Sequence, residues 1–246
     1  MNRSFGIELE IANITRETAL TALRAYGISV QNESYNHTNR PHWKLVHDAS
    51  VRGGFEVVSP VLHGEQGLEE ARAVADVLSD AGARVNRSCG FHVHFDASDL
   101  SVDDVKTIMR RYADHETEID ALMPPSRRGA GNSYCNTLTR LPFDRLMRAS
   151  SIQDMARIMG SRYYKVNLQA FQRHGTIEFR QHSGTANSAK IANWVRFLAE
   201  FIDACKTANQ SPAAPAPVVG HPSLRGVQAR LADMFTSQGV VSLSAM

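Results

Sequence analysis

The sequence predicts an α+β protein with a mainly antiparallel sheet. Segments in which apolar and polar residues alternate, as in β-strands, are interspersed with segments that have the periodicity of amphipathic helices. Two strand-like segments, HWKLVHDAS and GGFEVVSP, are separated by a short turn around residues 52–54, which is typical of a hairpin. The chain shows no internal repeat of fixed period, so we do not expect a repeat architecture.

The N-terminal part of the chain alternates strands with helices. SFGIELEIAN, residues 4–13, has the alternation of a strand, and we expect a helix from about Thr15 that stops at Gly27. After a polar stretch and the hairpin, residues 64–82 carry apolar side chains at helical spacing. GFHVHFD, residues 90–96, is the next predicted strand.

A long helix is predicted after this strand. Ser101 and Asp104 have the spacing of a capping box, and apolar residues continue at helical spacing through Ile119. Pro124 and Pro125 must end this helix, because proline lacks the amide hydrogen and clashes with the preceding turn.

The remaining elements follow a loop rich in arginine and glycine. A short helical stretch ends near Gly160, and two predicted strands follow, YYKVNLQAF at residues 163–171 and GTIEFRQHS at residues 175–183. The last predicted helix runs from about Ser188 to Ala208. We therefore expect residues 1–208 to form one domain and residues 209–246 to form a Pro/Ala-rich linker and a short tail.

Composition favours a small-molecule or peptide partner. The chain has 27 Lys and Arg against 25 Asp and Glu, so it offers no electrostatic reason to expect a nucleic acid or a membrane surface as partner. The three cysteines, Cys89, Cys135 and Cys205, are widely spaced, which favours a reducing compartment over a disulfide framework. No signal-like or membrane-spanning segment is evident, and we expect a soluble cytoplasmic protein.

Three predicted strands carry polar residues two positions apart, and a fourth carries a single acid. Side chains two apart on a strand point to the same face, about 6.5 Å from each other. The residues are Glu8 and Glu10, His92 and His94, Glu178 and Arg180, and the single Glu56. Any one pair alone is explained by a solvated sheet face. However, Glu10, Glu56 and Glu178 lie in apolar strands, and buried acids are rare unless they are paired or ligated.

If the four strands present these residues on the same face of the sheet, the carboxylates would repel one another unless cations lay between them. A set of ligands dominated by oxygen favours Mg²⁺ or Mn²⁺ over zinc. With Mg²⁺ in the site, the natural further ligand is a nucleotide phosphate.

The segments FGIELE, WKLVHDAS, FEVVSP, SCGFHVHFD and YYKVNLQAF with GTIEFRQHSGT, in this order, resemble the amidoligase family. This family is a branch of the carboxylate–amine ligases that include glutamine synthetase and glutamate–cysteine ligase. The resemblance covers about residues 4–205 and implies that residues 1–208 are a catalytic domain of the glutamine synthetase type. The implied fold is a curved, mainly antiparallel sheet with helices on its convex face. The implied reaction is ATP-dependent amide formation through an acyl phosphate, between a carboxylate donor and an amine acceptor.

The resemblance also implies roles for individual residues. Two or three divalent metal ions, Mg²⁺ or Mn²⁺, would be held by Glu8, Glu10, Glu56, His92 and Glu178. His94 would face the nucleotide or the acyl phosphate, and Arg180 would neutralise the transferred phosphate.

Further candidates come from the loops. Asp48 either binds and deprotonates the amine or closes the turn before residues 53–54. Arg162 and Lys165 lie where the superfamily keeps basic residues against phosphate, although such residues are usually solvated.

Two arginines and a histidine leave alternatives open. Arg127 and Arg128 are either a lid over the nucleotide or part of a mobile connection, and His182 continues the face of Arg180 toward the substrate.

Two other function classes are alternatives to the ligase. In a zinc hydrolase, His92 and His94 with carboxylates would hold a nucleophilic water, but glutamates outnumber histidines in the set. A non-catalytic binding module of the same fold would be expected to lose metal-binding acids, and all of them are present. The acceptor, whether ammonia, an amino acid or a peptide, stays open.

Overall fold

The computed structural model describes residues 1–210, and its eight-stranded sheet is arranged around the first strand, β1 (Ser4–Ala12). The strand order is β2-β3-β4-β1-β6-β8-β7, and β5 also pairs with β1. Every pairing is antiparallel except that of β2 with β3. The predicted α+β class with a mainly antiparallel sheet is therefore confirmed.

The other strands are short. Their bounds are β2 (Val30–Asn32), β3 (Trp43–Val46), β4 (Gly54–Val58), β5 (Leu62–His63), β6 (Phe91–Asp96), β7 (Val166–Asn167) and β8 (Thr176–Phe179).

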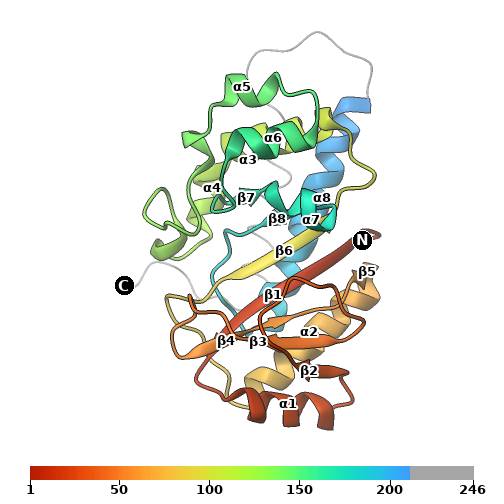
Figure 1. Cartoon of the computed structure of the whole chain (residues 1–246), viewed down its shortest axis with the longest axis vertical. Coiled ribbons are helices and arrows are strands. Elements are labelled where there is room, and N and C mark those ends of the chain that lie inside the picture. The colour runs from red at the N-terminus through yellow and green to blue at the C-terminus, as the bar shows by residue number, and fades with distance from the viewer. Residues whose placement is uncertain (211–246) are drawn as a thin grey trace. The chain divides into compact units, whose positions relative to one another are not determined.

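The helices gather in groups around the sheet (Figure 1). Figure 1 shows α1 and α2 at the end of the sheet formed by β2, β3 and β4, and α3 to α6 at the end formed by β7 and β8. The bounds are α1 (Arg16–Ala25), α2 (Gly64–Asp80), α3 (Val102–Asp114), α4 (Glu116–Ala121), η1 (Pro125–Arg127), η2 (Leu138–Arg140), α5 (Phe143–Met147), α6 (Ile152–Met159), α7 (Gln169–His174) and α8 (Ser188–Gln210). Among the described residues, no helix is both long enough and apolar enough to cross a membrane.

One face of the sheet contributes to the hydrophobic core. Ile7, Leu9 and Ile11 of β1 are almost completely buried, as are the alternate residues Phe91 and Val93 of β6. Because side chains alternate along a strand, the polar residues between them must point to the opposite face. The apolar half of the alternation thus anchors the sheet, and the other half is free to form a site.

Several local predictions are confirmed. β3 and β4 form an antiparallel hairpin, with Lys44 opposite Val58. Ser101 and Asp104 make a reciprocal capping box at the start of α3. Gly160 ends α6 in a left-handed conformation with φ 65°, which glycine adopts without steric cost.

The prediction of a single long helix through Ile119 is wrong. Helix α3 ends at Asp114, and α4 begins at Glu116. Glu116 turns inward, where its carboxylate accepts a hydrogen bond from the backbone nitrogen of Leu138 and pairs with Lys165. A tertiary contact therefore orients α4 separately from α3.

The prediction of a strand over residues 163–171 is wrong for most of its length. Only Val166–Asn167 pairs with β8, and α7 begins at Gln169. The Asn167 side chain accepts a hydrogen bond from the backbone nitrogen of Gln169, which turns the chain out of the sheet. The predicted linker and tail lie outside the described residues beyond residue 210.

A buried ion-pair network joins α4 to the end of the sheet. Lys165 is fully buried, and its Nζ lies 2.7 Å from Glu116 Oε1 and 2.6 Å from Asp120 Oδ1. Asp120 also accepts hydrogen bonds from the Gln181 side chain, at 2.6 Å, and from the backbone nitrogen of Gly129, at 2.7 Å. In the described part of the chain, Lys165 is the lysine that forms ion pairs with both Glu116 and Asp120.

We predict that Lys165→Met lowers the free energy of unfolding by about 3–5 kcal/mol, because it leaves two carboxylates in the interior without their cation. Urea denaturation would measure the change. Lys190→Met is the matched control, since Lys190 is exposed, and we expect it to stay within about 0.5 kcal/mol of the wild type. A loss for Lys165→Met no larger than that of the control would contradict the prediction.

Candidate functional site

The strand register brings the predicted site residues together on one face of the sheet. Glu8 lies opposite His92 across the β1–β6 pairing, and Glu10 lies opposite Glu56 across the β1–β4 pairing. The next pairing, β6 with β8, sets His94 opposite Glu178. Four strands thus contribute side chains to one continuous polar face.

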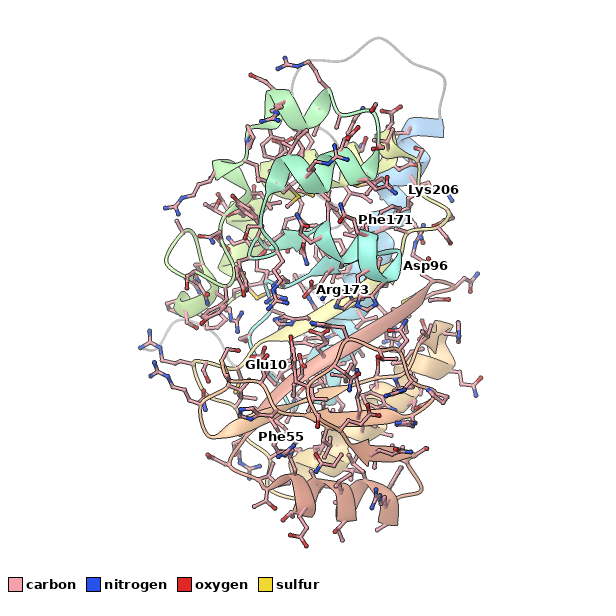
Figure 2. The ribbon with its side chains drawn as sticks, in the orientation of Figure 1. Glu10, Phe55, Asp96, Phe171, Arg173 and Lys206 are labelled. Carbon is pink, nitrogen blue, oxygen red and sulfur yellow. The ribbon has the colours of Figure 1, made fainter. Side chains whose placement is uncertain are left out.

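This face forms one wall of a large cavity of about 1800 Å³. Residues from β1, β4, β6 and β8 line the cavity together with the loops around residues 35–39, 47–52 and 162–163. Figure 2 shows Glu10 about midway between the two helical ends of the molecule. A cavity of this size can hold more than one small ligand at a time.

Three overlapping groups of acidic and histidine side chains have the geometry of metal sites. Within each group the potential ligand atoms lie within 4.8 Å of one another. The groups are Glu8, Glu56 and His92; Glu8, His94 and Glu178; and Glu10, Asp48 and Glu56. Glu8 and Glu56 are each shared by two groups, so the structure supports adjacent ions better than one isolated ion.

Both histidines face carboxylates. His92 Nδ1 lies 3.0 Å from Glu8 Oε2, and His92 Nε2 lies 3.8 Å from Glu10 Oε1. His94 Nε2 lies 3.2 Å from Glu8 Oε1 and 3.8 Å from Glu178 Oε1. The 3.2 Å contact lacks hydrogen-bond alignment, so this buried nitrogen has no hydrogen-bond partner among the described residues. An unpartnered imidazole nitrogen aimed at two carboxylates fits a metal ligand, so His94 can share the role predicted for His92.

At the β8 end of the face, an arginine and two histidines balance the charge of the carboxylates. Burial raises the pKa of a carboxylate, but for Glu178 the nearby Arg180 and His94 outweigh burial, and the pKa of Glu178 is lowered. Arg180 pairs directly with Glu178. Burial also raises the pKa of Glu8, yet the hydrogen bond to His92 and the approach of His94 hold that pKa well below its ordinary value.

The β4 end of the face has an excess of negative charge. Burial raises the pKa of Glu56 well above its ordinary value, and repulsion from Glu8 and Glu10 raises it further. Within residues 1–210, no lysine or arginine forms an ion pair with Glu10, Asp48 or Glu56. Such carboxylates fit a site for divalent cations, because cations would supply positive charge.

Neighbouring groups orient these carboxylates. The Gly90 backbone nitrogen donates to Glu10 Oε2 at 2.5 Å, and the Asn167 side chain donates to Glu178 Oε2 at 2.6 Å. Such contacts around ligand atoms fix their direction. Asn167 was not predicted at the site, because its role depends on the β7–β8 pairing and leaves no pattern in the sequence.

His37 and His174 were also missed as cavity residues. Both line the cavity, and the His174 ring meets the His94 ring edge-on, with centroids 6.2 Å apart. Lys44 lines the cavity as well, where its Nζ donates to the carbonyl oxygens of Asn36 and Thr38 and so holds that loop in place. Their positions in the sequence have no regular spacing from the paired polar residues of the strands, so the sequence pattern did not predict them as cavity residues.

Two loop residues predicted for the site, Asp48 and Arg162, differ in their contacts. Asp48 and Arg162 both line the cavity. Asp48 Oδ1 accepts hydrogen bonds from the backbone nitrogen and hydroxyl of Ser50, and the carboxylate belongs to the group with Glu10 and Glu56. Arg162 is exposed, and its guanidinium lies over the Tyr163 ring at 5.1 Å from the centroid.

The expectation that Lys165 contacts phosphate is corrected. Lys165 does not line the cavity, and its ammonium group is occupied by Glu116 and Asp120 in the interior. A sequence position beside a strand cannot show whether a lysine points to a cavity or into the core.

The expectation that His182 reaches the substrate is also corrected. Strand β8 ends at Phe179, so the alternation does not continue to His182. Its ring is buried against Phe91 and Trp194, and burial lowers its pKa to about 4.

The comparison with known families decides the affiliation of the chain. A family model with the description "Putative amidoligase enzyme" matches residues 1–202. The chain belongs to this family. No curated protein matches the sequence. Amidoligase membership indicates a ligase, and all three candidate metal groups lie within the matched residues.

We predict that metal affinity of this amidoligase rises with pH. In the metal-free protein the pKa of Glu56 is raised above its ordinary 4.5. Burial lowers the pKa of His94, but Glu178 and Glu8 outweigh burial, and this pKa is raised above 6.5. Both groups therefore keep their protons to a higher pH than usual, and a metal ion must displace those protons to bind.

Calorimetric titration with Mn²⁺ at a series of pH values would measure this effect. We expect the dissociation constant to fall as pH rises from 4.5 past 6.5, with proton release in the same window. An affinity that does not change across the window would contradict the prediction.

Proposed function

We propose that the chain is an ATP-dependent carboxylate–amine ligase that works through an acyl phosphate. The observation that supports this proposal is that three groups of carboxylate and histidine side chains line the same large cavity as Arg180. Phosphoryl transfer depends on positioning and charge stabilisation more than on a protein nucleophile, and this cavity offers many ligands and cations.

Two or three Mg²⁺ or Mn²⁺ ions fit the donors of this face. Carboxylate oxygens dominate the set, with imidazole in the minority, as these ions prefer. Glu10, Glu56 and Asp48 would hold one ion, and Glu8 and Glu178 with His92 or His94 would hold the neighbouring one. When bound, the ions supply positive charge to the phosphate oxygens.

Arg180 and Arg162 have distinct roles in the proposal. Arg180 is held by Glu178 on the sheet, and its guanidinium would stabilise the phosphoryl group during transfer. Arg162 is exposed on the cavity wall beside Tyr163, and we assign it to the nucleotide phosphates.

The proposed reaction has two steps. A carboxylate oxygen of the donor attacks the γ-phosphorus of ATP, the bond to the β-phosphate breaks, and ADP leaves. The amine nitrogen of the acceptor, a small molecule or a peptide, then attacks the acyl carbon, phosphate leaves, and the amine proton passes to a base. Asp48 is one candidate for this base, but its closeness to Glu10 and Glu56 makes a metal ligand the better assignment.

The zinc hydrolase is less well supported than the ligase. Zinc prefers nitrogen and sulfur ligands, and each candidate group here contains two or three carboxylates and at most one histidine.

The ligase is tested by nucleotide binding and by isotope transfer. We expect ATP with Mg²⁺ to raise the melting temperature and Glu10→Gln to abolish the shift, because the amide removes a metal-binding charge but can still accept from Gly90. Glu200→Gln, at an exposed position, is the control. A carboxylate donor labelled with heavy oxygen should pass label to the released phosphate. Phosphate release without label would contradict the acyl phosphate.

Asp48 allows a separate prediction. We expect Asp48→Asn to weaken Mn²⁺ binding about tenfold or more, because the variant removes one of three carboxylates from its group. Calorimetric titration would measure the change, with Asp203→Asn as a distant control. Unchanged Mn²⁺ affinity, together with a raised KM for the amine, would instead support the role of Asp48 in amine binding.

A further inference from the structure

Arg127 is a buried cation on the cavity wall that has no counter-ion among the described residues. The residue is 4% exposed and lines the cavity. Its Nη2 donates to the carbonyl oxygen of Cys89 at 2.6 Å, while its buried Nε has no hydrogen-bond partner among the described residues. A guanidinium group with this burial normally pairs with an anion, because burying an unpaired charge is costly.

The other buried cations differ from Arg127. Lys165 pairs with two carboxylates and Arg180 pairs with Glu178, whereas no carboxylate in the described part of the chain forms an ion pair with Arg127. Cys135 is a close neighbour of the guanidinium, but burial raises the pKa of this thiol to about 11. The thiol is therefore neutral and does not balance the charge.

Arg127 is positioned beside the candidate metal ligands. Gly90 separates them: a methyl group on Gly90 would lie 2.8 Å from Arg127 Nη2 and 2.9 Å from His92 Nε2. The absent side chain leaves room for the guanidinium and the imidazole next to the same backbone atom. The Gly90 nitrogen in turn donates to Glu10. The arginine thus lies at the edge of the carboxylate face.

The loop around Arg127 is anchored by hydrogen bonds to neighbouring segments. Arg128 Nε donates to the carbonyl oxygen of Met123 at 2.6 Å, and the Gly129 nitrogen donates to Asp120 at 2.7 Å. Arg128 is exposed and does not line the cavity. Two adjacent arginines therefore have different surroundings, and only Arg127 faces the site.

We propose that Arg127 binds an oxyanion of the reacting group, held between its guanidinium and the metal ions. Divalent ions at His92 and Glu10 would repel a neighbouring guanidinium. An anion between the ions and Arg127 would remove this repulsion and pair with the guanidinium. The proposal rests on the ligase function. Two groups offer this chemistry, the phosphoryl group and the donor carboxylate, and the planar guanidinium fork suits both.

The test titrates the full-length protein with inorganic phosphate and, separately, with acetate, each with and without Mg²⁺. We expect Arg127→Gln to weaken the binding of one of these anions about tenfold or more. Phosphate as the affected anion identifies the phosphoryl group, and acetate identifies the donor carboxylate. Arg128→Gln is the matched control and should stay within about twofold of the wild type.

Mn²⁺ titration separates anion binding from a structural role. Removal of a positive charge beside the ions should leave Mn²⁺ affinity unchanged or raise it, whereas a collapsed site would lose Mn²⁺ affinity. If Arg127→Gln does not fold, Arg127→Lys provides the test, because lysine keeps the positive charge and lacks the planar pair of guanidinium donors. It should bind the affected anion more weakly than the wild type and keep Mn²⁺ affinity.

Two results would overturn the proposal: wild-type protein that binds neither anion, or a folded Arg127 variant that binds both as tightly as the wild type. These results are distinct from failure of the ligase. A protein that transfers no heavy oxygen but whose anion binding depends on Arg127 would refute the acyl phosphate and leave the anion site standing.

Discussion

The crowding of carboxylates on one face of the sheet is the constraint on which the rest of the structure depends. Glu10, Glu56 and Glu178 are buried beside Glu8, and charges of one sign in the interior are tolerated only near charges of the other sign. The fold meets this requirement unevenly. At β8 Arg180 and the histidines balance the acids, while at β4 burial and repulsion from Glu8 and Glu10 raise the pKa of Glu56. This asymmetry links the architecture to the proposed ligase.

The buried apolar face of the sheet holds the polar face in position. The alternate residues of β1 and β6 are apolar and buried, so the polar face cannot turn away from the cavity without exposing the core. Hydrogen bonds from Gly90 and Asn167 then direct individual carboxylates. The fold thereby keeps the potential ligands close together before any ion binds, which reduces the cost of assembling the site.

The Lys165 network connects the core to the cavity. Asp120 binds Lys165 and Gln181, and it also accepts from Gly129 in the loop that carries Arg127. Gln181 directly follows Arg180 in the chain. The network therefore helps to position Arg127 and Arg180 from the interior side of the cavity wall. Lys165 was expected to contact phosphate, but it instead supports the two arginines that are proposed to bind anions.

Local pattern in the sequence determined the fold class, the hairpin, the capping box, the strand pairs that share a face and the family resemblance, because alternation and capping act between residues close in the chain. Only the tertiary structure decided that Glu8 meets His92 and that Asp48 joins Glu10 and Glu56. It also decided that α7 begins within a predicted strand, and that Arg127 faces the cavity while Lys165 does not. The physical reason is that alternation assigns a side chain to a face but not to a partner. Strand register and the direction of a charged side chain are set by contacts between segments far apart in the chain.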